Sequence, residues 1–410
     1  MPDSTVVTER QGFLAAFRYR NYCYLWGSGL GVATAISMEL VVMGWLVLEL
    51  TDSPALVGLV AACRFAGTAL APFFGALADR FDRRRILIVA RTAGIIYTLA
   101  LAALCYYELL EVWHIIIVAL CAGVIRAFDM TTSNVLAPDT VERHNLTSAV
   151  GMLIVGMSTT RMMGPLLGGH LFERIGADGC FAVMAAAYLF ACLLLFPMRL
   201  VGKERPTYTE SVWKSVIGGI HYIVNDRALF ALIVLAAIAN LFAFPCVFGI
   251  MPVFARDVLH VEASGLGQLI AAEGLGGLIG ALVITALGRF RHKGWLLIGA
   301  MIVWPALLGI FASLRLFPIS VALLVIVGIA RGIAMVTIQL LLLMWSSEEV
   351  RGRVIGTRMF AVLPLLVGNI LSGAGATFWG AATVIRINAL SCVFTSILTV
   401  FWAPQLRRRQ

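Results

Sequence analysis

The chain has 410 residues, of which 60% are hydrophobic and 13% are charged, and its formal net charge is +9 at pH 7. Soluble domains contain about 45–50% apolar and about 25% charged residues, so this composition excludes a soluble enzyme. Long apolar runs, such as residues 322–327, exclude the alternating pattern of an outer-membrane β-barrel. The basic residues are scattered at the ends of apolar runs, which fits membrane topology and argues against a nucleic-acid partner.

The apolar runs predict an all-α membrane protein with twelve transmembrane helices. A helix needs about 20 mostly apolar residues to cross the hydrocarbon core of a bilayer. Windows of that length give, in chain order, residues 22–48, 54–77, 86–107, 113–137, 147–172, 179–197, 228–252, 264–287, 295–314, 318–344, 355–379 and 381–402.

Lysine and arginine are distributed unequally between alternate loops. The N-terminal segment, every second loop and the C-terminal tail together hold 22, whereas the other loops hold three, namely Arg174, Arg256 and Arg315. Positive residues remain on the cytoplasmic side of a membrane. We therefore expect both termini in the cytoplasm and a multi-pass protein of the plasma membrane, that is, the bacterial inner membrane.

The longest polar stretch divides the predicted helices into six and six. Residues 212–224 within it predict an amphipathic surface helix. The halves resemble each other weakly, because residues 58–67 align with residues 267–276. Parallel repeats of this kind build transporters whose substrate cavity lies between the halves. The predicted divisions are a cytoplasmic segment 1–21, a six-helix bundle 22–198, a cytoplasmic linker 199–227, a pseudo-symmetric six-helix bundle 228–402 and a basic cytoplasmic tail 403–410.

Two motifs carry a family resemblance. Residues 75–86 read G-A-L-A-D-R-F-D-R-R-R-I, and residues 164–169 read G-P-L-L-G-G. The first motif is similar to the G-x-L-A-D-R-x-G-R-R-x-L signature of the major facilitator superfamily. The second resembles the G-P-x-x-G-G signature of its antiporter branch. Together with twelve spans and a central linker, the likeness covers nearly the whole chain and points to the exporter branch, with the enterobactin exporter group and multidrug proton antiporters.

The resemblance implies a cytoplasmic latch at the first motif. Asp79 would be held at a helix end by arginines or by the positive end of a helix dipole. The alternative is that the arginines only fix topology. Asp82 replaces the family glycine, and the second half keeps only residues 288–290 of the motif, which argues against a latch there. The expected latch residues are Gly75, Asp79, Arg80, Arg83 and Arg84.

The second motif predicts a tightly packed, bent helix. Small residues allow helix backbones to approach each other, and proline removes a backbone hydrogen bond. In the family this element resembles a hinge or a seal against leak. The expected hinge residues are Gly164, Pro165, Gly168 and Gly169.

Ionisable residues also fall inside the predicted spans. Each costs at least about 2.5–3.5 kcal/mol at a helix centre, so each is expected to face a cavity or a partner. Arg64 and Glu273 occupy equivalent positions of the two repeats, which predicts a charge pair or a shared cavity. Arg126 and Asp129 lie three residues apart on one helix face, where they are able to pair. The set comprises Glu39, Arg64, Arg126, Asp129, Arg161, Glu273, Arg331 and Arg386.

Glu39 and Glu273 are the first candidates for proton carriers, because a carboxylate in a low dielectric can load and release a proton as its cavity changes exposure. The alternative for either is a static hydrogen-bonding site. Arg126 and Asp129 are further coupling candidates. The family motif that links a helix 4 arginine to protons has glycine where Met130 stands here, so the resemblance is partial. The expected substrate-cavity residues are Arg64, Arg161 and Arg331, which favour an anionic or carbonyl-rich substrate.

The sequence therefore predicts a secondary active transporter and no enzyme activity. We expect a proton-coupled exporter of a small amphiphilic organic molecule, either a siderophore or a drug, that works by alternating access. Its expected partners are the substrate, protons and the lipid bilayer, with a monomeric state, no metal and no cofactor beyond the proton gradient. One alternative is an uptake permease or facilitator for an organic anion or nutrient. Another is a transporter-like membrane scaffold or assembly factor.

Overall fold

The computed structural model describes residues 14–70, 82–198, 212–287, 292–347 and 350–408, and no strand occurs in these ranges. Ten helices within them are long and apolar enough to cross a membrane. They are α1 (Arg20–Thr51), α4 (Arg83–Tyr106), α5 (Val112–Leu136), α6 (Leu146–Leu193), the segment from α8 (Arg227–Ile238) to α9 (Phe244–Phe248), α11 (Ala263–Leu287), α12 (Lys293–Phe311), α13 (Phe317–Trp345), the segment from α14 (Arg351–Arg358) to α15 (Leu363–Trp379), and α16 (Ala381–Trp402).

Shorter helices connect or extend these spans. The helix α2 (Pro54–Ala66) is apolar but shorter than the ten, and the predicted helix 54–77 passes outside the described residues after residue 70. The remaining short elements are η1 (Ala15–Arg18), η2 (Gly67–Leu70), η3 (Ala137–Thr140), η4 (Arg143–Asn145), α7 (Val212–Asn225), the π-helical turn η5 (Ala239–Ala243), α10 (Met251–Asp257), η6 (Met359–Val362) and α17 (Gln405–Arg408).

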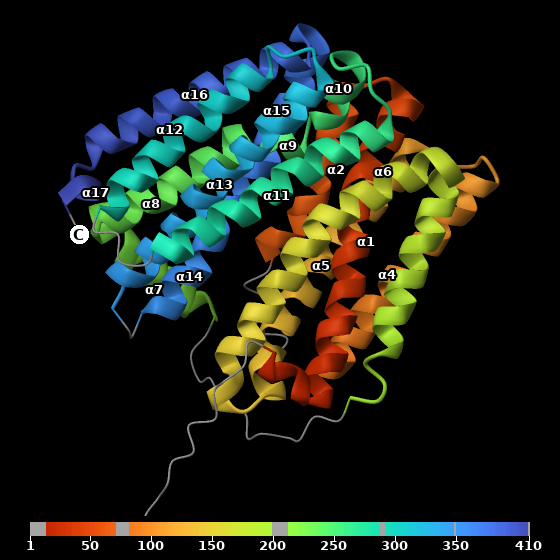
Figure 1. Cartoon of the computed structure of the whole chain (residues 1–410), viewed down its shortest axis with the longest axis horizontal. Coiled ribbons are helices and arrows are strands. Elements are labelled where there is room, and N and C mark those ends of the chain that lie inside the picture. The colour runs from red at the N-terminus through yellow and green to blue at the C-terminus, as the bar shows by residue number, and fades with distance from the viewer. Residues whose placement is uncertain (1–13, 71–81, 199–211, 288–291, 348–349, 409–410) are drawn as a thin grey trace, which may run out of the picture.

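The helices group by their position in the chain (Figure 1). The red to yellow-green helices α1, α2, α4, α5 and α6 pack on one another, and we call them the N-terminal half. The green to blue helices α8 to α16 pack beside them and form the C-terminal half. Helix α6 lies against α11, and α2 lies against α15, so these two pairs join the halves.

The helix α6 contains two of the predicted spans. Its 48 residues would measure about 72 Å if straight, more than twice the hydrocarbon thickness of a bilayer. At Gly176 the backbone adopts φ 72° and ψ −177°, a conformation open to glycine but strained for other residues. The chain turns there (Figure 1), between the predicted helices 147–172 and 179–197.

The predicted helix 228–252 ends earlier in the structure and contains an irregular turn. Helical backbone runs without a break through α8, the π-helical turn and α9 to Phe248, and α10 follows residues 249 and 250 as a separate short helix. Pro245 and Pro252 each stand in the first turn of one of these short helices. Proline has no backbone N–H, so it starts a helix readily but interrupts one that runs through it.

The outward faces of the helices are apolar. On α16, Leu390, Phe394 and Leu398 follow one another at four-residue spacing and are 71%, 63% and 51% exposed. Residues at this spacing share one helix face. A soluble protein rarely exposes such a stripe, whereas lipid chains solvate it well. The exposed stripe and the ten apolar helices establish a multi-pass protein of the cell membrane.

The predicted amphipathic helix over 212–224 matches α7. It packs against α14 and α8 in the C-terminal half. Ile217, Ile220 and Val224 remain exposed on one side of it. Asp226 then caps the N-terminus of α8 by accepting hydrogen bonds from the backbone N–H groups of Ala228 (2.9 Å) and Leu229 (3.3 Å).

Candidate functional site

A buried cluster in the N-terminal half is built around Glu39. Its Oε1 lies 3.0 Å from Nε of Arg64, and its Oε2 accepts a hydrogen bond of 3.1 Å from the Tyr97 hydroxyl. The Tyr97 and Tyr188 hydroxyls lie 2.9 Å apart. Glu39 and Arg64 are only 3% and 5% exposed. The cluster therefore joins α1, α2, α4 and α6 through one neutralised ion pair.

The C-terminal half holds its own buried ion pair. Glu273 on α11 pairs with Arg331 on α13, and the Arg331 guanidinium occupies the space that a side chain at Gly277 would fill. The predicted pairing of Arg64 with Glu273 is therefore wrong, because each pairs within its own half. A carboxylate and an arginine on neighbouring helices of one bundle satisfy each other at closer range than partners across the interface.

Arg126 on α5 has partners other than the one predicted. Its Nη2 donates a hydrogen bond of 2.7 Å to the Arg64 carbonyl oxygen, and its Cζ lies 4.7 Å from the centre of the Phe65 ring. The predicted pairing of Arg126 with Asp129 is wrong. The Arg126 side chain extends to α2, whereas Asp129 binds a residue of α4.

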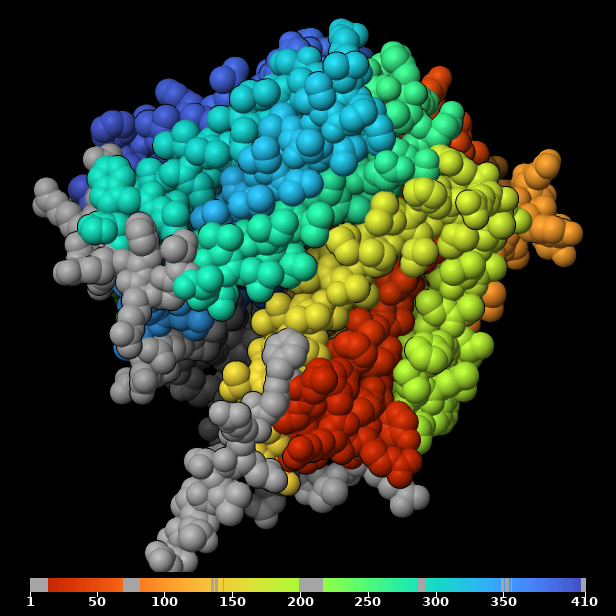
Figure 2. All heavy atoms as spheres, viewed as in Figure 1, coloured from red at the N-terminus to blue at the C-terminus, as the bar shows by residue number. Residues whose placement is uncertain are grey.

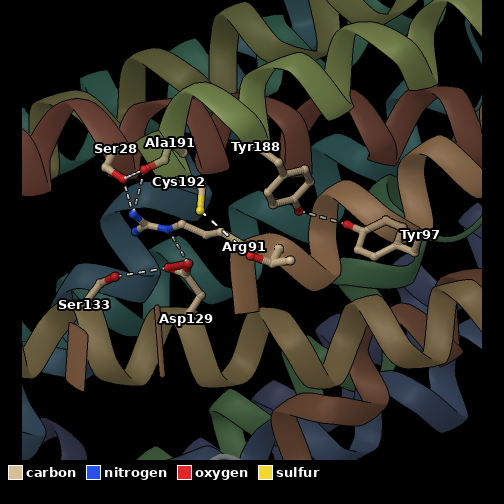
Figure 3. Close-up of polar contacts among 9 residues, drawn as sticks. Ser28, Arg91, Tyr97, Asp129, Ser133, Tyr188, Ala191 and Cys192 are labelled. Atoms are coloured by element: carbon tan, nitrogen blue, oxygen red, sulfur yellow. Dashed lines mark hydrogen bonds and ion pairs between the residues drawn. The ribbon is translucent and has the colours of Figure 1, made fainter. Parts of the chain in front are cut away.

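Arg91 on α4 is the partner of Asp129, and it lies at the centre of a second buried network in the N-terminal half (Figure 3). The Arg91 side chain is 0% exposed, and its Nε lies 3.1 Å from Oδ2 of Asp129. Arg91 also donates to the Ser28 hydroxyl and, at 3.4 Å, to the Ala191 carbonyl oxygen. Ser133 donates to the other carboxylate oxygen of Asp129 at 3.1 Å. The network joins α1, α4, α5 and α6.

Sequence reasoning missed this network. Arg91 lies inside the predicted helix 86–107, so its position alone indicated an arginine in the membrane. Tyr97 and Tyr188 carried no comparable signal, because tyrosine is common in transmembrane helices and nothing in its spacing indicates a hydrogen-bonded pair.

The latch motif is described only in part. Gly75, Asp79 and Arg80 lie outside the described residues. Arg83 forms an ion pair of 2.8 Å with Asp139, just after α5. Arg84 donates hydrogen bonds of 2.9 and 2.6 Å to the carbonyl oxygens of residues 195 and 196, after α6. Both arginines thus tie the start of α4 to other segments of the N-terminal half.

The hinge motif packs α6 against two helices. On one side, a Cβ atom at Gly168 would lie 3.1 Å from the Met38 Cα atom, and one at Gly164 would collide with Ser37, both on α1. On the other side, a Cβ atom at Gly169 would lie 2.9 Å from Cα of Ser264 on α11. The four motif residues therefore bring three helix backbones together, and Gly169 does so across the halves.

Contacts between the halves gather at the end of the molecule that carries the α1–α2 and α10–α11 turns, which we call the closed end. There Nη1 of Arg256 lies 2.6 Å from Oδ1 of Asp52, and the Ser264 N–H donates to Oε1 of Glu173 at 2.7 Å. Partial burial opposes charging of Arg256, but its hydrogen bonds to Asp257 and Asp52 outweigh this and raise the pKa of Arg256. Away from this end, the space-filling surface is hollowed beneath α11, beside the yellow first part of α6 (Figure 2).

Replacing Arg256 by alanine is expected to loosen the closed end. The change removes the ion pair to Asp52 and the 3.3 Å hydrogen bond to the Leu48 carbonyl oxygen, and it leaves the packing of α6 on α11 in place. Spin labels at Leu50→Cys and His260→Cys, both exposed positions, measure the separation of the halves in a cysteine-free background. Their distance distribution should gain a longer component in Arg256→Ala and stay unchanged in Arg256→Lys. An unchanged distribution in both variants contradicts a role for this ion pair.

The remaining intramembrane arginines take separate positions. Arg161 on α6 has an exposed side chain. Its carbonyl oxygen would lie 3.3 Å from a Cβ atom at Gly274 of α11. Arg386 is exposed on α16 and donates at 3.4 Å to the Ala312 carbonyl oxygen. Arg161 thus lies at the interface of the halves, whereas Arg386 forms its hydrogen bond within the C-terminal half.

The chain is similar to curated proteins named for multidrug efflux or multidrug resistance. The multidrug efflux pump Tap of Mycolicibacterium fortuitum is 24% identical over 393 residues, which cover 93% of each chain. The multidrug resistance protein MdtG of Salmonella typhimurium is 27% identical over 365 residues, which cover 86% of each chain.

Solved transporters share the fold. The nucleoside transporter NupG, as a point mutant, superposes with a TM-score of 0.74 at 16% identity and covers 93% of this chain and 99% of that one. A bacterial homologue of the human lysosomal transporter Spinster, in an inward-facing and unoccupied conformation, gives 0.73 at 15% identity and covers 95% and 96%. The family model of the transmembrane secretion effectors, MFS_3, matches residues 11–407. The chain therefore belongs to this family of major facilitator transporters.

Proposed function

We propose that the protein is a proton-coupled exporter of small amphiphilic organic molecules and that it works by alternating access. One curated relative is named a multidrug efflux pump and the other a multidrug resistance protein, and both align over most of the chain. We further propose twelve spans with both termini in the cytoplasm, in which α6 supplies two spans and α2 one. In this orientation the closed end faces the outside of the cell.

The observation that carries the proposal is a buried carboxylate in each half. Glu39 and Glu273 are both 3% exposed, and each is paired with one arginine. Leaving either arginine without its partner is costly in a low dielectric, so protonation of the carboxylate favours a rearrangement that gives the arginine another contact or water. Proton loading is in this way coupled to the packing of α1 on α2 and of α11 on α13.

The motif residues have mechanical roles in this scheme. Gly164, Pro165, Gly168 and Gly169 keep α6 close to α1 and α11 while the halves rotate. The latch motif, with Gly75, Asp79 and Arg80, acts at the cytoplasmic end together with Arg83 and Arg84. Asp129 holds Arg91 and serves in the stability of the N-terminal half, in place of the coupling role that its sequence position suggested.

Transport into proteoliposomes with an imposed pH gradient tests the coupling. With a panel of amphiphilic fluorescent compounds, we expect gradient-driven flux that falls at least about tenfold, or 1.4 kcal/mol, in Glu39→Gln and in Glu273→Gln. Exchange of substrate without a gradient should persist in both variants. The control is Glu108→Gln at an exposed turn, which should transport normally.

Three outcomes would contradict the proposal. The first is flux that no gradient drives. The second is unchanged gradient-driven flux in both glutamate variants, and the third is accumulation in the direction of uptake.

A further inference from the structure

The charged residues within the membrane-spanning helices do not cancel. Across the described part of the chain, Arg126 and Arg161 form no ion pair, because each buried carboxylate of the clusters already holds another arginine. The pairs are Glu39–Arg64, Asp129–Arg91 and Glu273–Arg331. An uncompensated guanidinium in a low-dielectric region is unfavourable, and an anion that binds it offsets much of that cost.

Arg126 is half-buried, and its position favours a ligand contact. One of its nitrogens binds the Arg64 carbonyl oxygen, and its guanidinium lies over the Phe65 ring. Glu39, the carboxylate nearest to this arginine pair, is already neutralised by Arg64, whose Nε lies 3.0 Å from its Oε1. A guanidinium has five N–H donors, so donors remain for a carboxylate, phosphate or sulfonate group.

An aromatic row continues from Arg126 into the other half. The Phe65 ring on α2 lies 5.8 Å from the Phe248 ring on α9, which stacks with Phe244 at 5.6 Å. Phe244 in turn meets the Trp304 ring edge-to-face at 5.2 Å. Phe65, Phe244 and Phe248 are only half-buried. The row crosses the interface between the halves and offers ring faces next to a cationic group.

We propose that this interface binds an organic anion with an aromatic or apolar body. Its anionic group binds Arg126, and its body packs on Phe65 and Phe248. Arg161, also at the interface, adds to the positive potential that favours the anion. This inference rests on the proposed transport function, and it names a substrate class that the names of the relatives do not state.

Binding of three probes with one aromatic body tests the charge preference. The probes are 2-naphthaleneacetate, 2-(2-naphthyl)ethanol and trimethyl(2-naphthylmethyl)ammonium, titrated calorimetrically into the full-length protein in nanodiscs, with empty nanodiscs subtracted. We expect the anion to bind at least about tenfold tighter than the cation. Arg126→Gln should remove most of that preference, and Phe65→Leu should weaken the anion and the alcohol alike. Equal or tighter binding of the cation overturns the proposal.

Two further variants guard against misfolding. Arg126→Lys keeps the charge and should keep most of the preference, whereas Arg161→Gln changes an exposed side chain and should weaken the anion several-fold. Arg386→Gln, which alters an arginine on the far helix α16, is the matched control and should bind like the parent. If Arg126→Gln and Arg161→Gln both fold and neither changes the preference, the assignment is wrong.

The same measurements separate this inference from the proposed function. Selective anion binding without gradient-driven flux of any compound leaves the binding site standing and refutes proton-coupled export. Gradient-driven flux of the naphthyl cation, with no flux or binding of the anion, supports the exporter and refutes the anion site.

Discussion

Replacing Arg91 by leucine is expected to destabilise the folded protein by about 3–5 kcal/mol. The change leaves Asp129 as an unpaired charge among four helices, and it also removes donors to Ser28 and to the Ala191 carbonyl oxygen. The loss exceeds that of an exposed pair such as Arg85–Asp82, where the measured range for surface ion pairs is about 0–1 kcal/mol. The unfolding midpoint of the purified protein in detergent measures it.

The double variant Arg91→Leu/Asp129→Leu distinguishes the charge from the packing. Buried ion pairs replaced by apolar residues of similar size are often neutral, so the double variant should be clearly more stable than Arg91→Leu alone. Asp82→Asn provides a surface control, because it removes the exposed ion pair to Arg85, keeps a side-chain oxygen that caps α4, and should therefore change the stability little. If the loss of stability in the double variant equals the sum of the losses in the two single variants, the network does not stabilise the protein through its charges.

Replacing Gly169 by leucine is expected to keep the closed end from closing. The side chain would enter the space of Ala263 and Ser264 on α11, in the other half. Overpacking of this kind costs typically about 1–3 kcal/mol, and the cost falls only on the state in which these helices touch. A bias of that size shifts a two-state equilibrium by about 5- to 150-fold. Spin labels at residues 50 and 260 should report a larger separation of the two halves. The Gly169→Leu variant should also lose transport.

A matched glycine shows whether the position matters. Gly299 on α12 has nothing within 4 Å of an added Cβ atom. Gly299→Leu should therefore transport and close like the parent. A Gly169→Leu protein that closes normally contradicts the assignment of α6 and α11 as an interface that separates during transport.

The sequence predicted the helices better than their interruptions. The length of an apolar run in a membrane-spanning helix is set by the thickness of the bilayer. Most observed helices therefore match the predicted ranges within a few residues. The π-helical turn after Ile238 and the helix end at Phe248 lie beside Pro245 and Pro252, and neighbouring helices that the sequence does not show allow a membrane helix to tolerate such irregularities. The kink at Gly176 was visible only as a gap between two apolar windows.

The charged residues were found, but their partners were not. Glu39, Arg64, Glu273 and Arg331 are all buried or half-buried ion-pair members. Pairing depends on which helix faces which, and two charged residues at equivalent repeat positions need not meet. Arg126 and Asp129 share a helix face by spacing, yet their side chains extend to different neighbouring helices.

The turn at Gly176 joins two parts of α6 that have different neighbours. The part before it contacts α11, and the part after it carries Tyr188 and Ala191, which bind the buried groups of the N-terminal half. No loop intervenes to absorb a displacement between these parts. Gly176 is therefore the covalent joint between the part of α6 that packs on the C-terminal half and the part whose Tyr188 reaches the Glu39 carboxylate through Tyr97.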